Sequence, residues 1–280
     1  MRNKTIIALI LVFCLTIVLA ACGKKEEIQI SETINSPDDF PGHNIAVQVD
    51  TTAAHRIDKM EEDGVKGIEV SRYEKVTYCF DDLSLGRVDA VFVDSVVAGY
   101  YTSGNDKYKL AWLDNVGEPL GICLAKPSVV LAAAVEAALD TMFFDGSMSR
   151  IATTHFGEDF TAGLRNVTAA PTIPTGFDTI NTGRFMVGVE VGYPPMEYKA
   201  DDGVTNMGFD IDVAYRLGEL LGLEVVFVDT AWDGIFFALE KGEYDVIISS
   251  VSITPERQER YILTEPYVSN ALCIVTRAED

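Results

Sequence analysis

The sequence predicts an α/β protein in which mostly parallel sheets are flanked by helices. Short apolar runs that favour buried strands alternate along the chain with longer segments that favour helices. Two of the runs, AVFV at residues 90–93 and VII at 246–248, are continuously apolar, which is typical of strands covered on both faces. With 280 residues, of which 48% are hydrophobic, the chain is long enough for one large or two medium-sized domains.

One strand–helix series occupies the first half of the chain. Strands are predicted at residues 44–49, 68–71, 90–93, 109–113 and 117–126. Helices are predicted at residues 53–62 and 73–85, from the end of the third strand to residue 100, and at 129–143 and 148–156. Alternation of this kind implies a largely parallel sheet with helices on both faces.

A change in amino-acid composition separates this series from a second one. Residues 160–182 are rich in Thr, Ala, Pro and Gly without clear periodicity, and we interpret them mostly as a linker. Beyond them, strands are predicted at residues 185–189, 224–228, 245–249 and 271–277. Helices are predicted at residues 212–221 and 232–241, and from Pro255 onward.

The N-terminus has the pattern of a secretion signal. Arg2 and Lys4 precede an apolar run, which ends in Leu19-Ala20-Ala21-Cys22-Gly23. This resembles the bacterial lipoprotein signal, in which cleavage precedes the cysteine and a lipid is attached to it. The alternatives are a plain transmembrane anchor, for which the run is short, and an ordinary signal with an incidental cysteine.

The lipoprotein interpretation sets the expected location of the protein. It implies a signal peptide at residues 1–21, lipidation of Cys22 and a tether over residues 22–37. We therefore expect the mature protein on the extracytoplasmic face of the cell membrane, attached through its lipid.

Composition excludes several functions. The 22 basic and 43 acidic residues give a net charge of −21 without any basic cluster, so a nucleic-acid partner is not expected. The three histidines lie far apart, and neither a metal nor another cofactor is expected. Cys79, Cys123 and Cys273 lie in apolar surroundings at wide spacing, which predicts buried, unpaired thiols.

The stretch DVIISSVSITPERQERYILTEPY at residues 245–267 predicts an anion site. A buried strand is followed by small polar residues and then by Thr254-Pro255, a favoured helix start. Arg257 lies in the first turn, so free N–H groups and a guanidinium would converge on one point, which suits a carboxylate. The alternative is an ordinary strand–loop–helix connection with a surface arginine.

Motifs in both halves of the chain resemble one receptor family. The first group comprises VGVEVGYPPMEY (187–198), GFDIDVAYRLGELLG (208–222) and WDGIFFALEKGEYDVIISSVSITPERQERYILTEPY (232–267). The second comprises AVQVDTTAA (46–54), GRVDAVFVDSVVAGYY (86–101), LGICLAK (120–126), the DGS turn and IATTHFGED (151–159). These resemble, respectively, the first lobe, and the second lobe with its return to the first, of extracellular solute-binding proteins of family 3. That family comprises polar amino-acid receptors of ABC importers.

The resemblance implies a two-lobed, type II periplasmic-binding-protein-like fold, with two mixed, mostly parallel sheets, flanking helices and a hinged cleft. The halves stand in the reverse of the family's order, so we expect a circular permutation. The expected parts are residues 38–115 as lobe II, 116–159 as the hinge return and part of lobe I, 160–180 as a linker and 181–280 as the rest of lobe I.

A permuted chain has two structural consequences. Phe40 and Arg277 must lie close together. Only the lobe crossing near residues 115–121 is expected to be covalent, because the chain would stop where the second crossing begins. The alternative is a fragment of a tandem receptor whose lobes are completed by a neighbouring copy or chain.

A receptor for a free amino acid must pair each charged group of its ligand, because unpaired buried charges are costly. For the α-carboxylate we expect Arg257 with N–H groups at Ser250 and Ser252, and from the other lobe the helix start at Thr51 and Thr52. The helix start at Thr51 and Thr52 follows Asp50, which stands where the family usually has glycine. The charge of Asp50 would repel a carboxylate unless its side chain points away or meets a cationic group of the ligand, and in the second case Asp50 would support a cationic ligand.

The remaining ligand groups have candidates in both lobes. Asp94 ends a buried strand, and the matching family residue holds the ammonium group, while a helix cap is the alternative. Tyr193 and Trp232 suit an aromatic sandwich for the side chain, although Trp232 could equally belong to the core. Glu190 lies where the family often reads the side chain, and its charge favours a basic or amide ligand.

These features predict a monomeric receptor that binds a free amino acid between closing lobes and delivers it to an ABC importer permease. We expect no enzymatic activity, since the sequence shows no nucleophile–base pair and no catalytic module. The alternatives are a ligand-sensing lipoprotein without transport and a cyclohexadienyl-dehydratase-like enzyme on the same fold.

Overall fold

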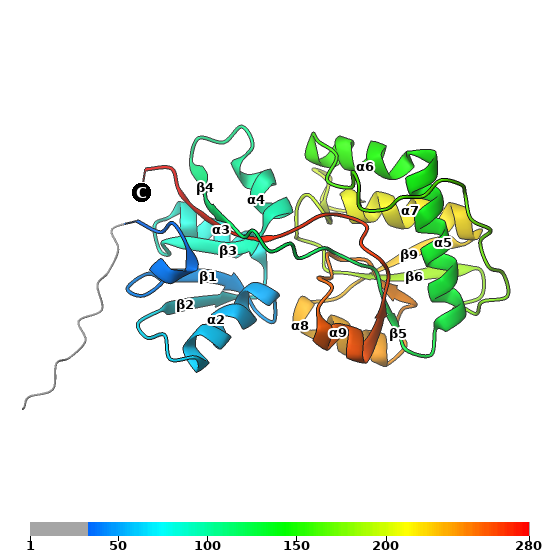
Figure 1. Cartoon of the computed structure of the whole chain (residues 1–280), viewed down its shortest axis with the longest axis horizontal. Helices are drawn as coiled ribbons and strands as arrows, with labels where there is room; N and C mark the ends of the chain where they lie inside the picture. Colours follow the sequence, from blue (N-terminus) through cyan, green and yellow to red (C-terminus); the bar gives the residue numbers. More distant parts are fainter. Residues whose placement is uncertain (1–32, 280) are drawn as a thin grey trace, which may run out of the picture.

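The computed structural model describes residues 33–279 and consists of two α/β lobes, shown side by side in Figure 1. One five-stranded sheet has the order β2-β1-β3-β12-β4 and the other the order β11-β5-β10-β6-β9. We call the first lobe II (residues 33–113 and 272–279) and the second lobe I (residues 120–268). The expected two-lobed α/β fold is confirmed. Within residues 33–279, no helix has both the length and the apolar character needed to span a membrane.

Lobe II is built by the first strand–helix series. It contains η2 (Pro37–Asp39), β1 (Asn44–Gln48), α2 (Thr52–Glu62), β2 (Glu69–Tyr73), α3 (Val76–Ser84), β3 (Ala90–Asp94), α4 (Ser95–Thr102) and β4 (Tyr108–Leu113). Strand β1 pairs in parallel with β2 and β3. Helix α3 starts later than expected, because β2 continues in register with β1 as far as Tyr73.

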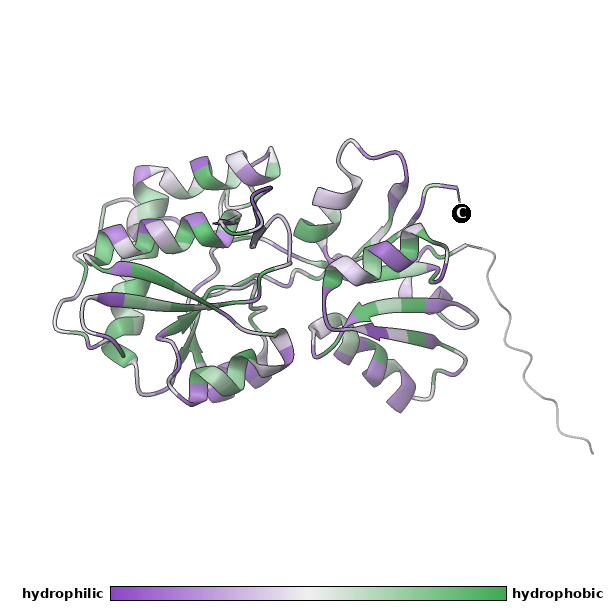
Figure 2. Ribbon diagram, turned by 180° about the vertical axis from the view of Figure 1, so that it is seen from behind, coloured by the Kyte–Doolittle hydropathy of each residue, from purple (hydrophilic) through white to green (hydrophobic). Residues whose placement is uncertain are grey.

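Lobe I is built by the second series together with the return from lobe II. It contains β5 (Cys123–Ala125), α5 (Val129–Asp145), α6 (Ser147–Phe156), β6 (Arg184–Val189), β7 (Tyr198–Lys199), β8 (Asn206–Met207), α7 (Phe209–Leu221), β9 (Glu224–Asp229), α8 (Trp232–Glu240), β10 (Val246–Ile247), α9 (Pro255–Arg260) and β11 (Tyr261–Leu263). Only the end of the expected strand 117–126 is regular, because its first part forms the crossing between lobes. The hydropathy colouring in Figure 2 shows hydrophobic strands in both sheets and mixed helix surfaces, as expected for sheets covered by amphipathic helices.

The last strand, β12 (Leu272–Arg277), lies in lobe II rather than in lobe I. It pairs antiparallel with β3 on one side and β4 on the other, and only its final residue is not buried. The expected boundary 181–280 for the rest of lobe I therefore does not fit the sheet. A buried apolar strand needs hydrogen-bond partners on both edges, and lobe II supplies both.

The placement of β12 makes both lobe crossings covalent, so the expectation of a single covalent crossing was wrong. The first crossing runs from β4 to β5 and the second from β11 to β12, and Figure 1 shows them passing between the lobes. They are tied together by hydrogen bonds from Glu118 N to Asn270 O (2.8 Å) and from Leu120 N to Val268 O (3.2 Å). The hinge is thus a pair of hydrogen-bonded chain segments.

The two ends of the described chain lie close together in lobe II, as Figure 1 shows. Arg277 Nη1 donates to Val88 O (2.6 Å), and its Nη2 lies 3.9 Å from Asp89 Oδ1. The other carboxylate oxygen of Asp89 accepts from Asn44 N (2.8 Å), at the start of β1. The short path from β12 to β1 is the geometry that the permuted order requires.

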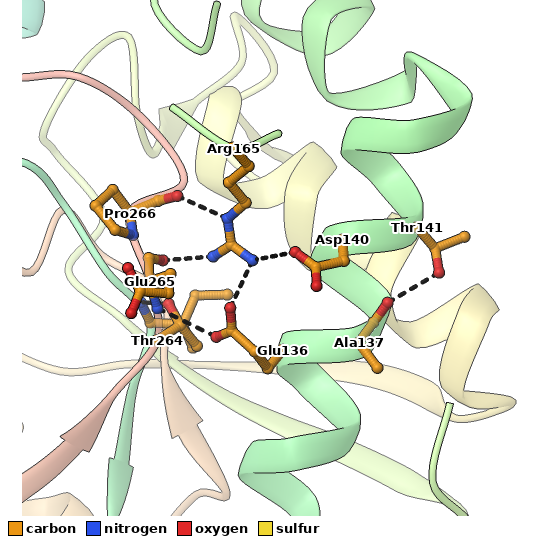
Figure 3. A network of polar contacts seen from close by, with 9 residues as sticks. Glu136, Ala137, Asp140, Thr141, Arg165, Thr264, Glu265 and Pro266 are labelled. Atoms are coloured by element: carbon orange, nitrogen blue, oxygen red, sulfur yellow. Dashed lines mark hydrogen bonds and ion pairs between the residues drawn. The ribbon is translucent and has the colours of Figure 1, made fainter. Parts of the chain in front are cut away.

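The segment between α6 and β6 has no helix or strand but is anchored by Arg165 (Figure 3). The Arg165 side chain is 5% exposed and donates from Nη1 to Glu136 Oε1 (2.6 Å) and Asp140 Oδ1 (2.8 Å) on α5. Its Nε donates to Pro266 O (2.9 Å) in the second crossing. Through Arg165, this segment therefore links the second crossing between the lobes to α5.

Most of the expected N-terminal features lie outside the described residues. These are the signal peptide at 1–21, the lipidation site Cys22 and the tether as far as residue 32. The end of the expected tether packs on lobe II, where Ile34 is buried in a cluster with Phe40 and Ile45. Cys79, Cys123 and Cys273 are buried free thiols, as expected.

Candidate ligand-binding cleft

A small cavity lies between the lobes where β1, β3, β6 and β10 end. Its volume is about 20 Å³, which is room for roughly one water molecule. Every residue that we expected to contact a ligand lines it, together with three that the sequence did not indicate. The lining residues are Gln48, Thr51, Thr52, Asp94, Glu190, Tyr193, Glu197, Trp232, Ser249, Ser250, Ser252 and Arg257. A free amino acid is larger than this cavity, so its entry requires the lobes to separate.

Arg257 is the basic side chain in the cavity wall. Its Nη1 donates to Ser252 O (3.0 Å), and its guanidinium carbon lies 5.5 Å from the Trp232 ring centre and 5.0 Å from that of Phe236. Within the described part of the chain, no carboxylate is within ion-pair distance of it. Burial lowers the pKa of Arg257, while the charge of Glu118 raises it. The guanidinium is held in place by rings and one carbonyl, which leaves donors for an anion.

The start of helix α9 contributes less than the sequence suggested. The helix has only six residues, and the Thr254 hydroxyl already accepts the Arg257 N–H (3.3 Å). The anion site of lobe I therefore depends on the guanidinium more than on free N–H groups.

In lobe II, Thr51 and Thr52 form the start of α2. Thr51 Oγ1 accepts from Ala54 N (3.2 Å), which makes it the N-cap. Thr52 Oγ1 donates to Glu118 Oε1 (2.6 Å) in the first crossing. This bond ties the helix start to the hinge.

Asp94 faces the cleft and makes no capping bond to α4. It is 8% exposed and accepts from Tyr193 OH (2.5 Å) and from Asn270 Nδ2 (2.5 Å). Burial, followed by the nearby charge of Glu118, raises the pKa of Asp94 to about 6. Its hydrogen bond with Tyr193 joins the two lobes.

The side-chain end of the cleft contains Glu190 and Gln48. Gln48 Nε2 donates to both carboxylate oxygens of Glu190, at 2.9 Å each, from the opposite lobe. Burial raises the pKa of Glu190 to about 7, although Gln48 and the charge of Lys75 oppose this shift. Gln48 was missed because, in sequence, it is only the last polar residue of a strand.

The loop Ser249–Ser252 is held from behind by two buried acids. Asp210 Oδ2 accepts from Ser250 N (2.9 Å), and Glu197 Oε1 accepts from Ser249 Oγ (2.5 Å). Ser250 has a φ of 50°, an uncommon backbone conformation that this bond to Asp210 helps to hold. The signal that could have identified both acids is a carboxylate inside an apolar run, in PPMEY and GFDID.

The aromatic candidates both lie in the cleft wall, and Trp232 also belongs to the core. Trp232 packs in a buried cluster with Ile235 and Tyr244, which agrees with the alternative interpretation. Its Nε1 nevertheless reaches across the cleft to Asp50 O (3.1 Å). Asp50 has a φ of 56°, and its side chain is 64% exposed beside His55. The carboxylate of Asp50 therefore points away from the cavity, and the expected repulsion does not arise.

The buried acids predict an unusual dependence of stability on pH. The pKa values of Asp94 and Asp210 are about 6 and that of Glu190 is about 7, each raised chiefly by burial above ordinary values of 3.8 and 4.5. The folded state therefore holds protons that the unfolded chain releases between about pH 4 and 7, and the free energy of unfolding falls as pH rises through this window. We expect Tm to be roughly 5 °C or more higher near pH 5.5 than near pH 8, by differential scanning calorimetry.

A control isolates the contribution of Glu190. In Glu190→Gln the fall of Tm with pH should be smaller than in the parent, because one raised pKa is removed. A Tm that increases from about pH 5.5 to 8 in the parent would contradict the assignment.

Comparison with known proteins finds a family match in the last third of the chain. Residues 185–280 match the bacterial extracellular solute-binding proteins, family 3. This stretch is about a third of the chain, and over it the sequence is similar to that family. The matched part includes α7, α8, α9 and the serine loop, and thus the Arg257 side of the cleft.

Individual proteins are similar to part of this chain. The L-cystine-binding protein TcyJ of Escherichia coli (strain K12) is 36% identical over 90 residues, which cover 32% of this chain and 34% of the relative. Cyclohexadienyl dehydratase of Pseudomonas aeruginosa is 31% identical over 97 residues, covering 35% of this chain and 36% of the relative. The solved arginine-bound form of domain 1 from TmArgBP is 32% identical, with coverage of 35% of this chain and 82% of that one and a TM-score of 0.30. The matches thus span about a third of the length of the curated relatives.

Proposed function

We propose that this protein is a receptor that binds a free amino acid between its lobes and delivers it to an ABC importer. The observation that carries the proposal is that Arg257 of lobe I and Asp94 of lobe II line the same cavity. A guanidinium suits an α-carboxylate, and a carboxylate suits an α-ammonium. Because the two groups come from opposite lobes, a zwitterion that binds both favours closure.

The charges around the cavity support a ligand with a basic or amide side chain. Asp94 and Glu190 line it, against Arg257 as the basic lining residue within residues 33–279. Once the ligand's α-groups have paired with Arg257 and Asp94, the carboxyl group of Glu190 favours a donor-rich or cationic side chain. Tyr193 and Trp232 add flat surfaces for its aliphatic part.

The same proposal includes location and partners. The sequence at Cys22 supports a lipid-anchored protein on the extracytoplasmic face of the membrane, and the family match at residues 185–280 supports a permease of the ABC type as its partner. We propose that the protein acts as a monomer, with one ligand in each chain.

We further propose that the lobe order is a circular permutation. It is supported by the family match at residues 185–280, in the last third of the chain, and by the bonds that join Arg277 to the start of β1 through Asp89. Light scattering with ligand titration separates this from a fragment of a tandem receptor. A monomer that binds one ligand favours permutation, whereas binding only by a dimer would reject it.

The function is tested by a thermal-shift panel of the twenty amino acids. We expect one chemical class, with basic or amide side chains, to raise Tm by several degrees at about 1,000 times its dissociation constant, since such binding adds about 4 kcal/mol. Acidic amino acids serve as the control and should give no shift. The absence of a shift with every amino acid would reject the proposal and favour a receptor for another ligand or a sensor without transport.

A second candidate is an enzyme similar to cyclohexadienyl dehydratase. It is favoured by the similarity to that enzyme and by the pKa of Glu190, which is about 7 and suits a general acid or base. Turnover of prephenate that disappears in Glu190→Gln would support this candidate. Amino-acid binding without any turnover would leave the receptor function alone.

A further inference from the structure

Gln48 occupies the position from which a ligand side chain would reach Glu190. It is 4% exposed at the end of β1, and its Nε2 bonds both oxygens of the Glu190 carboxylate and also Glu74 O (3.0 Å). The carboxylate expected to read the ligand is therefore already bound by an amide of the same chain. The cavity beside it, about 20 Å³, holds roughly one water molecule and no amino acid.

The contact is one of several direct bonds between the lobes. Lys75 Nζ donates to Val191 O (2.8 Å), Tyr193 OH to Asp94 Oδ2 (2.5 Å) and Trp232 Nε1 to Asp50 O (3.1 Å). Each joins a group of lobe II to a group of lobe I without any atom between them. These bonds favour the closed arrangement by themselves, and in the Gln48–Glu190 pair a single amide bonds both oxygens of a buried carboxylate across the cleft.

Only half of the Gln48 amide is satisfied. Its Oε1 is buried and has no hydrogen-bond partner within residues 33–279, whereas its Nε2 has three acceptors. A buried acceptor without a donor is unfavourable. When a ligand side chain takes the place of Nε2 at Glu190, the displaced amide can turn this oxygen toward water, so the amide is readily exchanged for a group that carries several N–H donors.

We propose that Gln48 is an internal competitor for Glu190, which bridges the lobes and selects cationic ligand side chains. This inference rests on the proposed receptor function. A short side chain leaves the Gln48–Glu190 bonds intact and is not opposed by them. A ligand with a neutral amide side chain exchanges the Gln48 amide for its own at Glu190, so its binding gains little free energy. A guanidinium or ammonium replaces the amide with an ion pair, and its gain exceeds the loss.

The competition predicts that Gln48→Leu increases the affinity for a cationic ligand, which is unusual for the loss of a polar group from a binding site. A residue that merely lines a site weakens binding when its polar group is removed, but removal of a competitor strengthens binding. By isothermal titration calorimetry we expect Gln48→Leu to bind L-arginine about tenfold more tightly than the parent, since a hydrogen bond to a charged group is lost only from the ligand-free protein. Affinity for L-alanine, whose complex keeps the Gln48–Glu190 bonds in the parent, should not increase.

Two further measurements keep the test independent of folding defects. Gln258→Leu makes the same chemical change on the exposed face of α9 and should leave both affinities unchanged. Small-angle X-ray scattering of protein freed of amino acids should give a larger radius of gyration for Gln48→Leu, and for Gln48→Ala as a second variant, than for the parent.

The outcomes separate this inference from the proposed function. Tighter arginine binding without tighter alanine binding supports it. Weaker or unchanged arginine binding in Gln48→Leu overturns it, as does a parent that binds some amino acid but not arginine, and both leave the receptor function standing. If no amino acid binds to the parent, the receptor function fails, and the inference fails with it.

Discussion

Replacing Arg257 with alanine is expected to weaken amino-acid binding by about a thousandfold. Arg257 is the basic residue in the cavity wall within residues 33–279, and it has no carboxylate partner there. In the variant, the closed lobes would bury the ligand's carboxylate without a matching cation, which costs about 3–5 kcal/mol. Titration calorimetry with the amino acid found by the thermal-shift panel measures this directly.

Two companion variants make the result specific. Arg257→Lys keeps the charge but loses the planar pair of donors, so its affinity should fall between those of the parent and the alanine variant. Arg260→Ala removes the neighbouring exposed arginine of α9, which pairs with Glu240, and should change affinity less than twofold. Binding by Arg257→Ala within tenfold of the parent would show that the carboxylate lies elsewhere.

Replacing Gly208 with alanine is expected to unfold lobe I or destabilise it by more than about 4 kcal/mol. A Cβ at this position would lie 2.1 Å from Met196 O, and the φ of +133° is one that side chains rarely adopt. The clash is with backbone that cannot yield, because Met196 O also accepts from Asp210 N (2.9 Å). Far-UV circular dichroism during urea unfolding measures the loss.

The matched control is Gly234→Ala in α8, where an added Cβ meets no atom within 4 Å. Alanine favours a helix over glycine by about 1 kcal/mol, so this variant should be equal to or more stable than the parent. A Gly208→Ala protein as stable as the parent would show that the loop 193–197 and α7 are not packed as described. The effect also reaches the site, since Asp210 on α7 holds the Ser250 N–H.

The interlocked strands give the hinge a physical basis. Each lobe receives one antiparallel strand from the other half of the chain, with β5 entering lobe I and β12 entering lobe II. The segments leading to these strands are hydrogen-bonded to each other, and Arg165 holds one of them to α5. Lobe motion is thus expected to occur through small rotations in two adjacent segments, not through one free linker.

The predictable part of the site follows from where strands end. Asp94 and Glu190 come directly after buried runs, and the carboxyl ends of parallel strands meet at one edge of a sheet. Arg257 follows a strand and a capped helix start, so its approximate position was also predictable from the sequence. Gln48, in contrast, has no distinguishing neighbours, and its role depends on a carboxylate 142 residues away.

The sequence by itself determined the local elements, their caps and the motifs of the Arg257 side, because these depend on the periodicity of apolar residues and on backbone groups within a few residues. Only the tertiary structure decided that β12 belongs to lobe II, since an apolar strand carries no local sign of which sheet edge it will pair with. Its partners in β3 lie some 180 residues away, as the bond between Cys273 and Val93 illustrates. The same holds for the contacts across the cleft, which depend on how two separately formed lobes meet.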